Sequence, residues 1–207
     1  MLSFLRGAYG RALTPSARLL LRLGLTPTQV TVAGTLAVVI AALATLPAGR
    51  FVVGPVLVCC FLLADGLDGT MARLGGGESR LGAFLDSTLD RIADAAVFAA
   101  LVVWAAGRDA VTLWLALGAL AGGFLVSYAR ARAEAEGWDA SVGLFERTDR
   151  LAVVLAGTFA VGLGAPAAVL TVALGIVAAG SAVTVGQRIA AAVRGAGGPS
   201  RPAPGQW

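Results

Sequence analysis

Apolar residues dominate six stretches of the chain, which fall near residues 28–48, 51–73, 83–106, 111–130, 150–165 and 167–188. Gly, Pro or charged residues separate the stretches. A helix needs about 20 mainly apolar residues to cross the hydrocarbon core of a bilayer. Because a backbone in lipid must satisfy its own hydrogen bonds, the pattern predicts an all-α integral membrane protein, a bundle of six transmembrane helices over about residues 28–190.

The two ends of the chain differ from the predicted spans. Residues 1–22 interleave arginines with apolar residues, which predicts an amphipathic helix lying in the membrane interface and argues against a cleavable signal peptide. The tail at residues 195–207 is rich in Gly and Pro and lacks a periodic apolar pattern, so we expect it to be disordered. Residues 1–194 then form a single membrane domain.

The composition agrees with a membrane location. Hydrophobic residues make up 57% of the sequence, well above the share in soluble domains, and the mean hydropathy is +0.83. The net charge of +4 comes from arginines that are scattered among the spans, with no lysine or histidine, so we expect no nucleic-acid partner. The adjacent Cys59 and Cys60 lie inside an apolar run, which favours a packing role over a disulfide or a metal site.

The arginines also predict the orientation. An even number of spans places both termini on the same side of the membrane. With the termini inside, every arginine except Arg50, Arg91 and Arg108 falls in cytoplasmic segments or at cytoplasmic span ends. The positive-inside rule therefore predicts a multi-pass protein of the cell membrane with both termini in the cytoplasm.

Four aspartates flank the turn between the second and third spans. Asp65 and Asp68 are spaced i, i+3, and Asp86 and Asp90 are spaced i, i+4, so each pair shares one face of its helix. The intervening segment LGGGESRLG allows the helices to return antiparallel, and we expect the four carboxylates to converge near the cytoplasmic side. Like charges repel strongly in a low dielectric, and an unpaired carboxylate is costly to bury in a bilayer.

Divalent cations would relieve this repulsion, because hard cations prefer carboxylate oxygens. We therefore expect Mg²⁺ or Mn²⁺, two ions per site, with open positions for phosphate oxygens. Two other interpretations stay open: buried ion pairs with Arg73, Arg80 and Arg91, or a divalent-metal transporter, since acids inside spans also mark ion pathways. Asp94 continues the series one turn deeper and suits helix packing or an indirect hydrogen bond better than metal ligation.

Eight of these residues fit the motif D-x2-D-G-x2-A-R-x8-G-x3-D-x3-D, namely Asp65, Asp68, Gly69, Ala72, Arg73, Gly82, Asp86 and Asp90. On this motif the chain resembles the CDP-alcohol phosphotransferases. The resemblance implies transfer of a phosphatidyl group from CDP-diacylglycerol to an alcohol, with the first three aspartates as metal ligands and Asp90 as both ligand and catalytic base. The absence of histidine also leaves a carboxylate as the obvious base.

The resemblance further implies a set of contacts to the CDP-lipid donor. These residues are Thr28, Gln29, Val30, Thr31, Gly69, Ala72, Arg73 and Ser79. Within LTPTQVT, Pro27 and Thr28 equally suit a helix start, with Pro in the first turn and Thr as the capping residue. Capping and ligand contact are compatible with each other.

The second half of the chain bears on the acceptor. The stretches SYARARAEAEG (127–137) and GLFERTDRL (143–151) are similar to those of the actinobacterial phosphatidylinositol phosphate synthases. The resemblance implies that four arginines bind the phosphate of a myo-inositol phosphate, namely Arg130, Arg147, Arg150 and Arg188. Arginine clusters capture phosphate through charge-assisted hydrogen bonds, but pairing with Glu134, Glu146 and Asp149 is the alternative. Arg132 lies off the Arg130 face, which favours a structural role for it.

Two other acceptors remain open. A phosphatidylglycerophosphate synthase would use glycerol 3-phosphate, which is also phosphorylated. A plain alcohol would leave the arginine cluster without a ligand. The resemblance also implies a homodimer, and the small residues AGG at 121–123 suit close helix contacts within or between chains.

Overall fold

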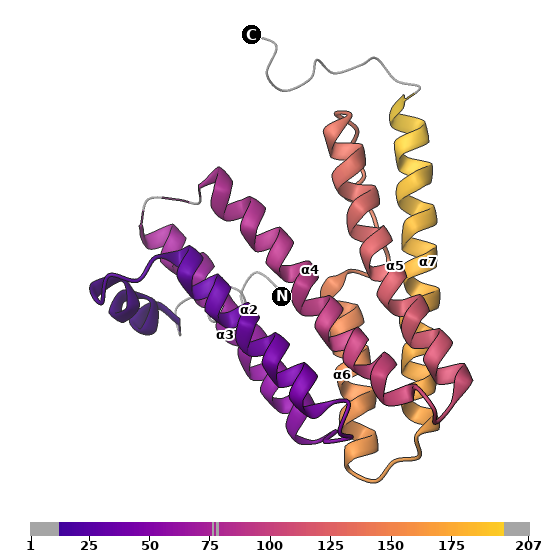
Figure 1. Ribbon diagram of the computed structural model, residues 1–207. Coiled ribbons are helices and arrows are strands. Elements are labelled where there is room, and N and C mark those ends of the chain that lie inside the picture. Colours follow the sequence, from indigo (N-terminus) through magenta and orange to yellow (C-terminus); the bar gives the residue numbers. More distant parts are fainter. Residues whose placement is uncertain (1–12, 76, 78, 197–207) are drawn as a thin grey trace. The chain divides into compact units, whose positions relative to one another are not determined.

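The computed structural model describes residues 13–75, 77 and 79–196, and the side chain of Asp65 lies outside the described set (Figure 1). Every regular element in these ranges is a helix, which confirms the predicted all-helical fold. Residues 13–22 are helical. The elements that follow are α2 (Pro27–Thr45), α3 (Val53–Leu74), α4 (Arg80–Ala105), α5 (Ala110–Ala135), α6 (Arg147–Gly162) and α7 (Ala168–Ala196).

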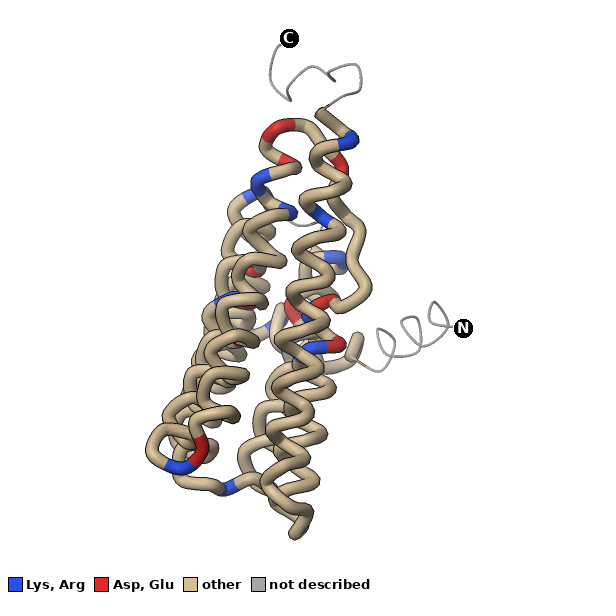
Figure 2. Tube along the Cα trace, turned by 90° about the vertical axis from the view of Figure 1, so that its right-hand side faces the viewer, with Lys and Arg blue, Asp and Glu red and all other residues tan. Residues whose placement is uncertain are grey.

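Four helices of the described part, α2, α3, α5 and α7, are long and apolar enough to cross a membrane. Long stretches of these helices carry no charged residue (Figure 2). The helix α6 has 16 residues, which is short for a span. The helix α4 carries four charged residues after its start, namely Asp86, Asp90, Arg91 and Asp94. The membrane character of the chain is therefore clear from four helices, and the count of six spans stays a prediction.

Several helices extend beyond the apolar stretches that predicted them. The helix α4 begins at Arg80, α5 continues to Ala135, and α7 continues to Ala196. Hydropathy marks only the part of a helix that suits lipid, whereas main-chain hydrogen bonding continues into polar surroundings. Gly195 and Ala196, which we expected in the tail, therefore belong to α7, and residues 197–207 lie outside the described residues.

The chain divides into two compact units, the first ending at Val97 and the second beginning at Phe98. In the first unit α2 packs against α3. Gly54 permits this close approach, because a Cβ atom there would lie 2.5 Å from Thr45 Oγ1 and 2.6 Å from a Leu46 methyl carbon. The packing of α2 against α3 brings Asp68 of α3 beside Thr31 of α2.

In the second unit α5 and α6 each pack against α7. A Cβ atom on Gly122 would lie 2.8 Å from Cβ of Ser181, and one on Gly157 would lie 2.6 Å from Cβ of Ala173. The small residues at 121–123 therefore do support a close contact within the chain. Such contacts stabilise helix pairs in lipid, where apolar burial gives little driving force.

The helix at residues 13–22 and the two cysteines of α3 were both subjects of predictions from the sequence. In the helix at residues 13–22 Ala17 is fully buried and Arg18 and Arg22 are exposed, while residues 1–12 of the predicted interfacial helix lie outside the described residues. Cys59 and Cys60 are exposed on α3. Their predicted packing role within the chain is wrong, because they lie on the outer surface of an apolar helix.

Candidate functional site

The start of α2 is fixed by a capping box. The Thr26 hydroxyl accepts a hydrogen bond from the main-chain N–H of Gln29 at 3.3 Å, and the Gln29 side chain accepts one from the N–H of Thr26 at 2.9 Å. Pro27 takes the first helical turn as predicted. The capping residue is Thr26 and not Thr28, because the box requires Gln three positions after the cap.

A cavity of about 550 Å³ opens beside this helix start. Its lining joins the beginning of α2, the end of α3, the turn after it and the beginning of α4. Nine of the residues predicted to form the motif or to contact CDP line it: Thr28, Thr31, Asp68, Gly69, Ala72, Arg73, Ser79, Gly82 and Asp86. Gln29 and Val30 are not among the lining residues, and the Gln29 side chain serves the capping box instead.

Asp68 is held in place on one wall of the cavity. Its Oδ2 accepts a hydrogen bond from the Thr31 hydroxyl at 2.5 Å, and its Oδ1 accepts one from the main-chain N–H of Gly69 at 2.5 Å. These two bonds fix the orientation of the carboxylate. The hydrogen bond between Thr31 and Asp68 was not predicted. The two residues lie on different helices, and no pattern in the sequence indicates such a contact.

Asp86 and Asp90 lie one turn apart on α4. Asp86 lines the cavity, and its carboxylate has no hydrogen bond or ion pair to any residue that the structure describes. Asp90 Oδ2 lies 3.4 Å from an Arg91 guanidinium nitrogen. The cavity lining therefore combines a fixed carboxylate from α3 with one from α4, as the predicted antiparallel return requires.

The other two aspartates of the region, Asp65 and Asp94, lie on α3 and α4. The main chain of Asp65 lies in α3 one turn before Asp68, and its side chain is outside the described set. Asp94 is buried, with 8% of its surface exposed, in keeping with a packing role. Among the described side chains no group of three or more His, Cys, Asp or Glu is gathered closely enough to hold a metal, so convergence of the four carboxylates stays a prediction.

Arg73 and Arg91, the arginines near the aspartates, have different partners. Arg73 lines the cavity and donates a hydrogen bond to the Thr70 hydroxyl at 3.0 Å, and Thr70 in turn donates to the Gly66 carbonyl oxygen at 3.0 Å. Of the ion pairs proposed as the alternative, the contact of Arg91 with its neighbour Asp90 is found. The Arg73 guanidinium thus lies beside the cavity, tied to a neutral hydroxyl.

Three apolar residues, Leu21, Leu25 and Met71, also line the cavity. Nothing in the sequence distinguishes them, since each belongs to an ordinary apolar stretch. They give the cavity a lipophilic wall next to its polar one. A ligand with an anionic head and an apolar tail would match both walls.

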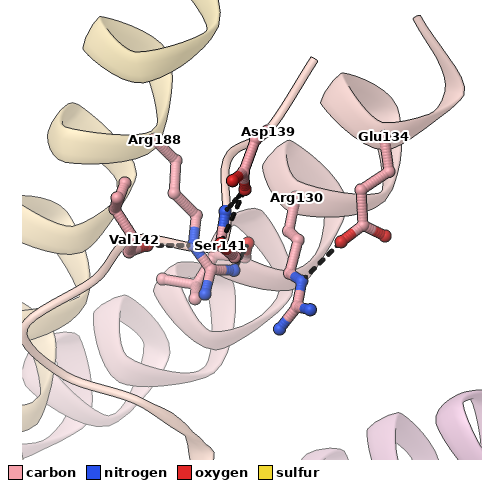
Figure 3. A network of polar contacts seen from close by, with 7 residues as sticks. Arg130, Glu134, Asp139, Ser141, Val142 and Arg188 are labelled. Carbon is pink, nitrogen blue, oxygen red and sulfur yellow. Dashed lines mark hydrogen bonds and ion pairs between the residues drawn. The ribbon is translucent and has the colours of Figure 1, made fainter. Parts of the chain in front are cut away.

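In the second unit Arg150 and Arg188 are almost completely buried, with 1% and 4% of their surfaces exposed. Arg188 donates from Nε to the Val142 carbonyl oxygen at 2.9 Å and from a terminal nitrogen to the Val126 carbonyl oxygen at 2.5 Å (Figure 3). Arg150 donates to the Phe145 carbonyl oxygen at 3.4 Å. Main-chain carbonyls thus fix the orientation of both guanidinium groups.

The remaining arginines of the predicted cluster lie differently. Arg147 is half-buried at the first position of α6. Arg130 is more exposed and pairs with Glu134 at 2.7 Å, as the alternative interpretation expected (Figure 3). Arg132 pairs with Glu136 one turn further on, in keeping with its predicted structural role.

Comparison with known proteins identifies the family of the chain. The model of the CDP-alcohol phosphatidyltransferase family matches residues 24–191. The chain belongs to this family. The resemblance inferred from the aspartate motif is therefore confirmed, and the family model covers both units.

Individual relatives are also similar over most of their length. A phosphatidylinositol phosphate synthase of Mycolicibacterium smegmatis is 46% identical over 208 residues, which span 97% of this chain and 93% of the relative. One of Mycobacteroides abscessus is 46% identical over 187 residues, 89% of this chain and 84% of the relative.

Solved structures of a phosphatidylinositol phosphate synthase are also similar to this chain. The crystal structure of the Mycobacterium tuberculosis phosphatidylinositol phosphate synthase with CDP-DAG bound has a TM-score of 0.88 to this chain at 41% identity, covering 93% of this chain and 99% of that one. A second structure of that synthase, in complex with manganese and citrate, has a TM-score of 0.87 at 41% identity, covering 92% and 93% of the two chains.

Proposed function

We propose that the protein transfers the phosphatidyl group of CDP-diacylglycerol to a myo-inositol phosphate, giving phosphatidylinositol phosphate and CMP. The observation that carries the proposal is the cavity lined by Asp68, Gly69, Arg73 and Asp86, because it joins both halves of the family motif. The relatives that are 46% identical and named phosphatidylinositol phosphate synthase support the choice of acceptor.

The cavity suits the head group of the donor. Its volume of about 550 Å³ lies within the range of small-molecule sites. The Arg73 guanidinium would bind the pyrophosphate through charge-assisted hydrogen bonds, and Gly69 leaves the main chain accessible beside it. Thr28, Thr31 and Ser79 supply hydroxyl groups for the nucleotide, while the apolar wall would accept the start of the acyl chains.

The aspartates would hold Mg²⁺ or Mn²⁺, two ions in this proposal, through Asp65, Asp68, Asp86 and Asp90. The described residues fit such a group, because the Asp68 carboxylate is fixed by two hydrogen bonds and the Asp86 carboxylate faces the same cavity without a described partner. Carboxylate oxygens are the ligands that both ions prefer. When bound, the ions would neutralise negative charge that develops on the transferred phosphate.

Asp90 is the proposed catalytic base. It would take the proton of the acceptor hydroxyl as that oxygen attacks the phosphorus that bears diacylglycerol. The new phosphorus–oxygen bond forms while the bond to the CMP oxygen breaks, and CMP leaves with the electron pair. No covalent intermediate with the protein is needed, and a carboxylate within reach of the hydroxyl is sufficient for the proton transfer.

The acceptor phosphate is assigned to the arginines of the second unit, Arg130, Arg147, Arg150 and Arg188. Two of these guanidinium groups are buried and held by main-chain carbonyls, so little side-chain entropy remains to be lost on binding an anion. Arg130 would have to exchange its contact with Glu134 for the ligand. This arrangement favours a phosphorylated acceptor over a plain alcohol.

The cellular setting forms part of the proposal. The protein would lie in the cell membrane with six spans, both termini and the substrate sites on the cytoplasmic side, and residues 1–22 in the interface. A homodimer is proposed on the family resemblance. A divalent-metal transporter is the remote alternative, and CMP release without metal flux in liposomes would exclude it.

The acceptor can be tested directly. Purified protein in detergent micelles with CDP-diacylglycerol and Mg²⁺ is offered myo-inositol phosphate, free myo-inositol or glycerol 3-phosphate at equal concentrations. CMP release and the lipid product are then measured. The proposal expects turnover with inositol phosphate at the highest kcat/KM, whereas a preference for glycerol 3-phosphate would identify a phosphatidylglycerophosphate synthase and a preference for free inositol would remove the role of the arginines.

A further inference from the structure

The connector between α5 and α6, residues 138–146, has no regular secondary structure, yet both of its ends are fixed. Gly137, with φ of 77°, ends α5, and the N–H of Trp138 donates to the Ala133 carbonyl oxygen at 2.9 Å. At the other end the N–H of Glu146 donates to the Asp149 carboxylate at 2.9 Å, which caps α6. The connector therefore leaves one helix and enters the next at defined positions.

Between these ends the connector follows α7 in the opposite chain direction. A Cβ atom on Gly195 would lie 3.2 Å from Trp138, and one on Gly180 would lie 2.7 Å from the Phe145 ring. The two glycines are 15 residues apart, which corresponds to about 22 Å along a helix. Small residues on α7 thus provide a groove in which the connector lies.

Two side chains of α7 bind the main chain of the connector. The Gln187 Oε1 accepts a hydrogen bond from the N–H of Leu144 at 2.9 Å, and the Thr184 hydroxyl accepts one from the N–H of Phe145 at 3.0 Å. The Leu144 side chain is 70% exposed, so its own side chain does not hold this part of the connector. Thr184 is fully buried and donates in turn to the Gly180 carbonyl oxygen at 2.9 Å.

The residues that follow are those assigned to the acceptor phosphate. Phe145 stands two positions before Arg147, and its carbonyl oxygen accepts a hydrogen bond from Arg150. The N–H groups that Gln187 and Thr184 bind therefore lie immediately before the first turn of α6. A shift of the connector along α7 would move the start of α6 and both arginines with it.

We propose that Thr184 and Gln187 are positioning residues for acceptor recognition, acting by setting the place of the α6 start against α7. The inference rests on the proposed function, because it presumes that Arg147 and Arg150 bind the acceptor phosphate. Neither residue touches the substrate in this account. Their effect falls on the KM for the acceptor, while the donor is bound by residues of the first unit.

The test compares Gln187→Ala with Gln187→Glu, since glutamate keeps an acceptor oxygen for the Leu144 N–H. Gln187 is exposed, so its truncation leaves the helix packing intact. The loss of one main-chain hydrogen bond predicts a rise of about fivefold in the acceptor KM of Gln187→Ala, with the KM for CDP-diacylglycerol unchanged. Gln187→Glu restores most of the acceptor affinity, and Val183→Ala, a change at an exposed apolar position of the same helix, leaves both constants at the wild-type value.

A second pair of variants keeps the inference testable if glutamate disturbs nearby arginines. Thr184→Val removes the hydroxyl at nearly constant volume, and Thr184→Ser retains it. We expect the acceptor KM to rise in Thr184→Val and to stay near the wild-type value in Thr184→Ser. An unchanged acceptor KM in both Gln187→Ala and Thr184→Val, or an equal change in both substrates' KM values, overturns the inference.

The two proposals fail in different ways. If the wild-type protein prefers glycerol 3-phosphate, the proposed acceptor is wrong, and the positioning role is judged from the KM of that phosphorylated acceptor instead. If it prefers free inositol, both proposals fail together. If it prefers inositol phosphate, and Gln187→Ala and Thr184→Val leave the acceptor KM at the wild-type value, only the positioning role fails.

Discussion

The hydroxyl of Thr31 on α2 donates a hydrogen bond to Oδ2 of Asp68 on α3, with 2.5 Å between the two oxygens. The bond joins two helices through the carboxylate that the motif assigns to metal binding. Together with the hydrogen bond from the Gly69 N–H to Oδ1, it fixes the orientation of the Asp68 carboxylate. Hydrogen bonds of this kind behind a metal ligand are often worth about 10- to 100-fold in metal affinity or activity.

Thr31→Val should therefore weaken metal binding while the protein still folds. We expect the Mg²⁺ concentration for half-maximal CMP release to rise about tenfold. Thr31→Ser, which keeps the hydroxyl, should restore the wild-type value. Thr35→Val removes a buried hydroxyl one turn further along α2 and serves as the matched control. An equal effect of the two valine variants would show that Thr31 acts through packing alone.

Asp90→Asn should abolish turnover while the protein still folds. Asparagine has the size of aspartate but cannot take the proton of the acceptor hydroxyl. CMP release should fall by about 1000-fold, within the range for loss of a general base. Asp109→Asn removes a carboxylate outside the cavity, at the cap of α5 where asparagine also caps well, and should keep near-normal activity. Near-normal CMP release by Asp90→Asn would exclude Asp90 as the base.

Arg73→Gln should impair binding of the donor. The Arg73 guanidinium lines the cavity, and loss of a charge-assisted hydrogen bond to pyrophosphate predicts a rise of about 10-fold or more in the KM for CDP-diacylglycerol. The acceptor KM should not change. The matched control is Arg80→Gln, which removes the same charge at an exposed position of α4 that does not line the cavity. Equal effects of the two variants would indicate a general loss of positive charge.

Gly157→Ala should destabilise the second unit. Its Cβ atom would lie 2.6 Å from Cβ of Ala173, so α6 and α7 would have to move apart. Overpacking of this kind costs about 1–3 kcal/mol. Thermal unfolding in detergent measures the loss. Gly118→Ala is the control, since its Cβ atom would meet Ala178 at an ordinary 3.6 Å, and it should unfold at the wild-type temperature.

Hydropathy was sufficient to predict where the helices lie, because the cost of exposing main-chain polar groups to lipid makes long apolar stretches helical. It could not predict the ends at Arg80 or Ala196, since those turns are polar or small and are held by main-chain hydrogen bonds. The spacing of Asp65, Asp68, Asp86 and Asp90 predicted a shared face on each helix. Among the described side chains, Asp68 and Asp86 do line one cavity.

The contacts that pass between helices were beyond sequence reasoning. Thr31 and Asp68 are 37 residues apart, and Leu144 and Gln187 are 43 apart. No periodic pattern encodes which polar side chain of one helix will meet a given group of another. The exposed Cys59 and Cys60 show the same limit, because an apolar run in a membrane protein does not reveal which of its faces turns to lipid.

The central claim is that carboxylates of α3 and α4 act through bound divalent ions. The most direct measurement is CMP release from CDP-diacylglycerol by protein stripped with a chelator and then supplied with Mg²⁺ or Mn²⁺. The account predicts that turnover is lost on stripping, returns with either ion, and returns only at much higher ion concentration in Asp86→Asn. Full activity of the stripped protein would contradict it.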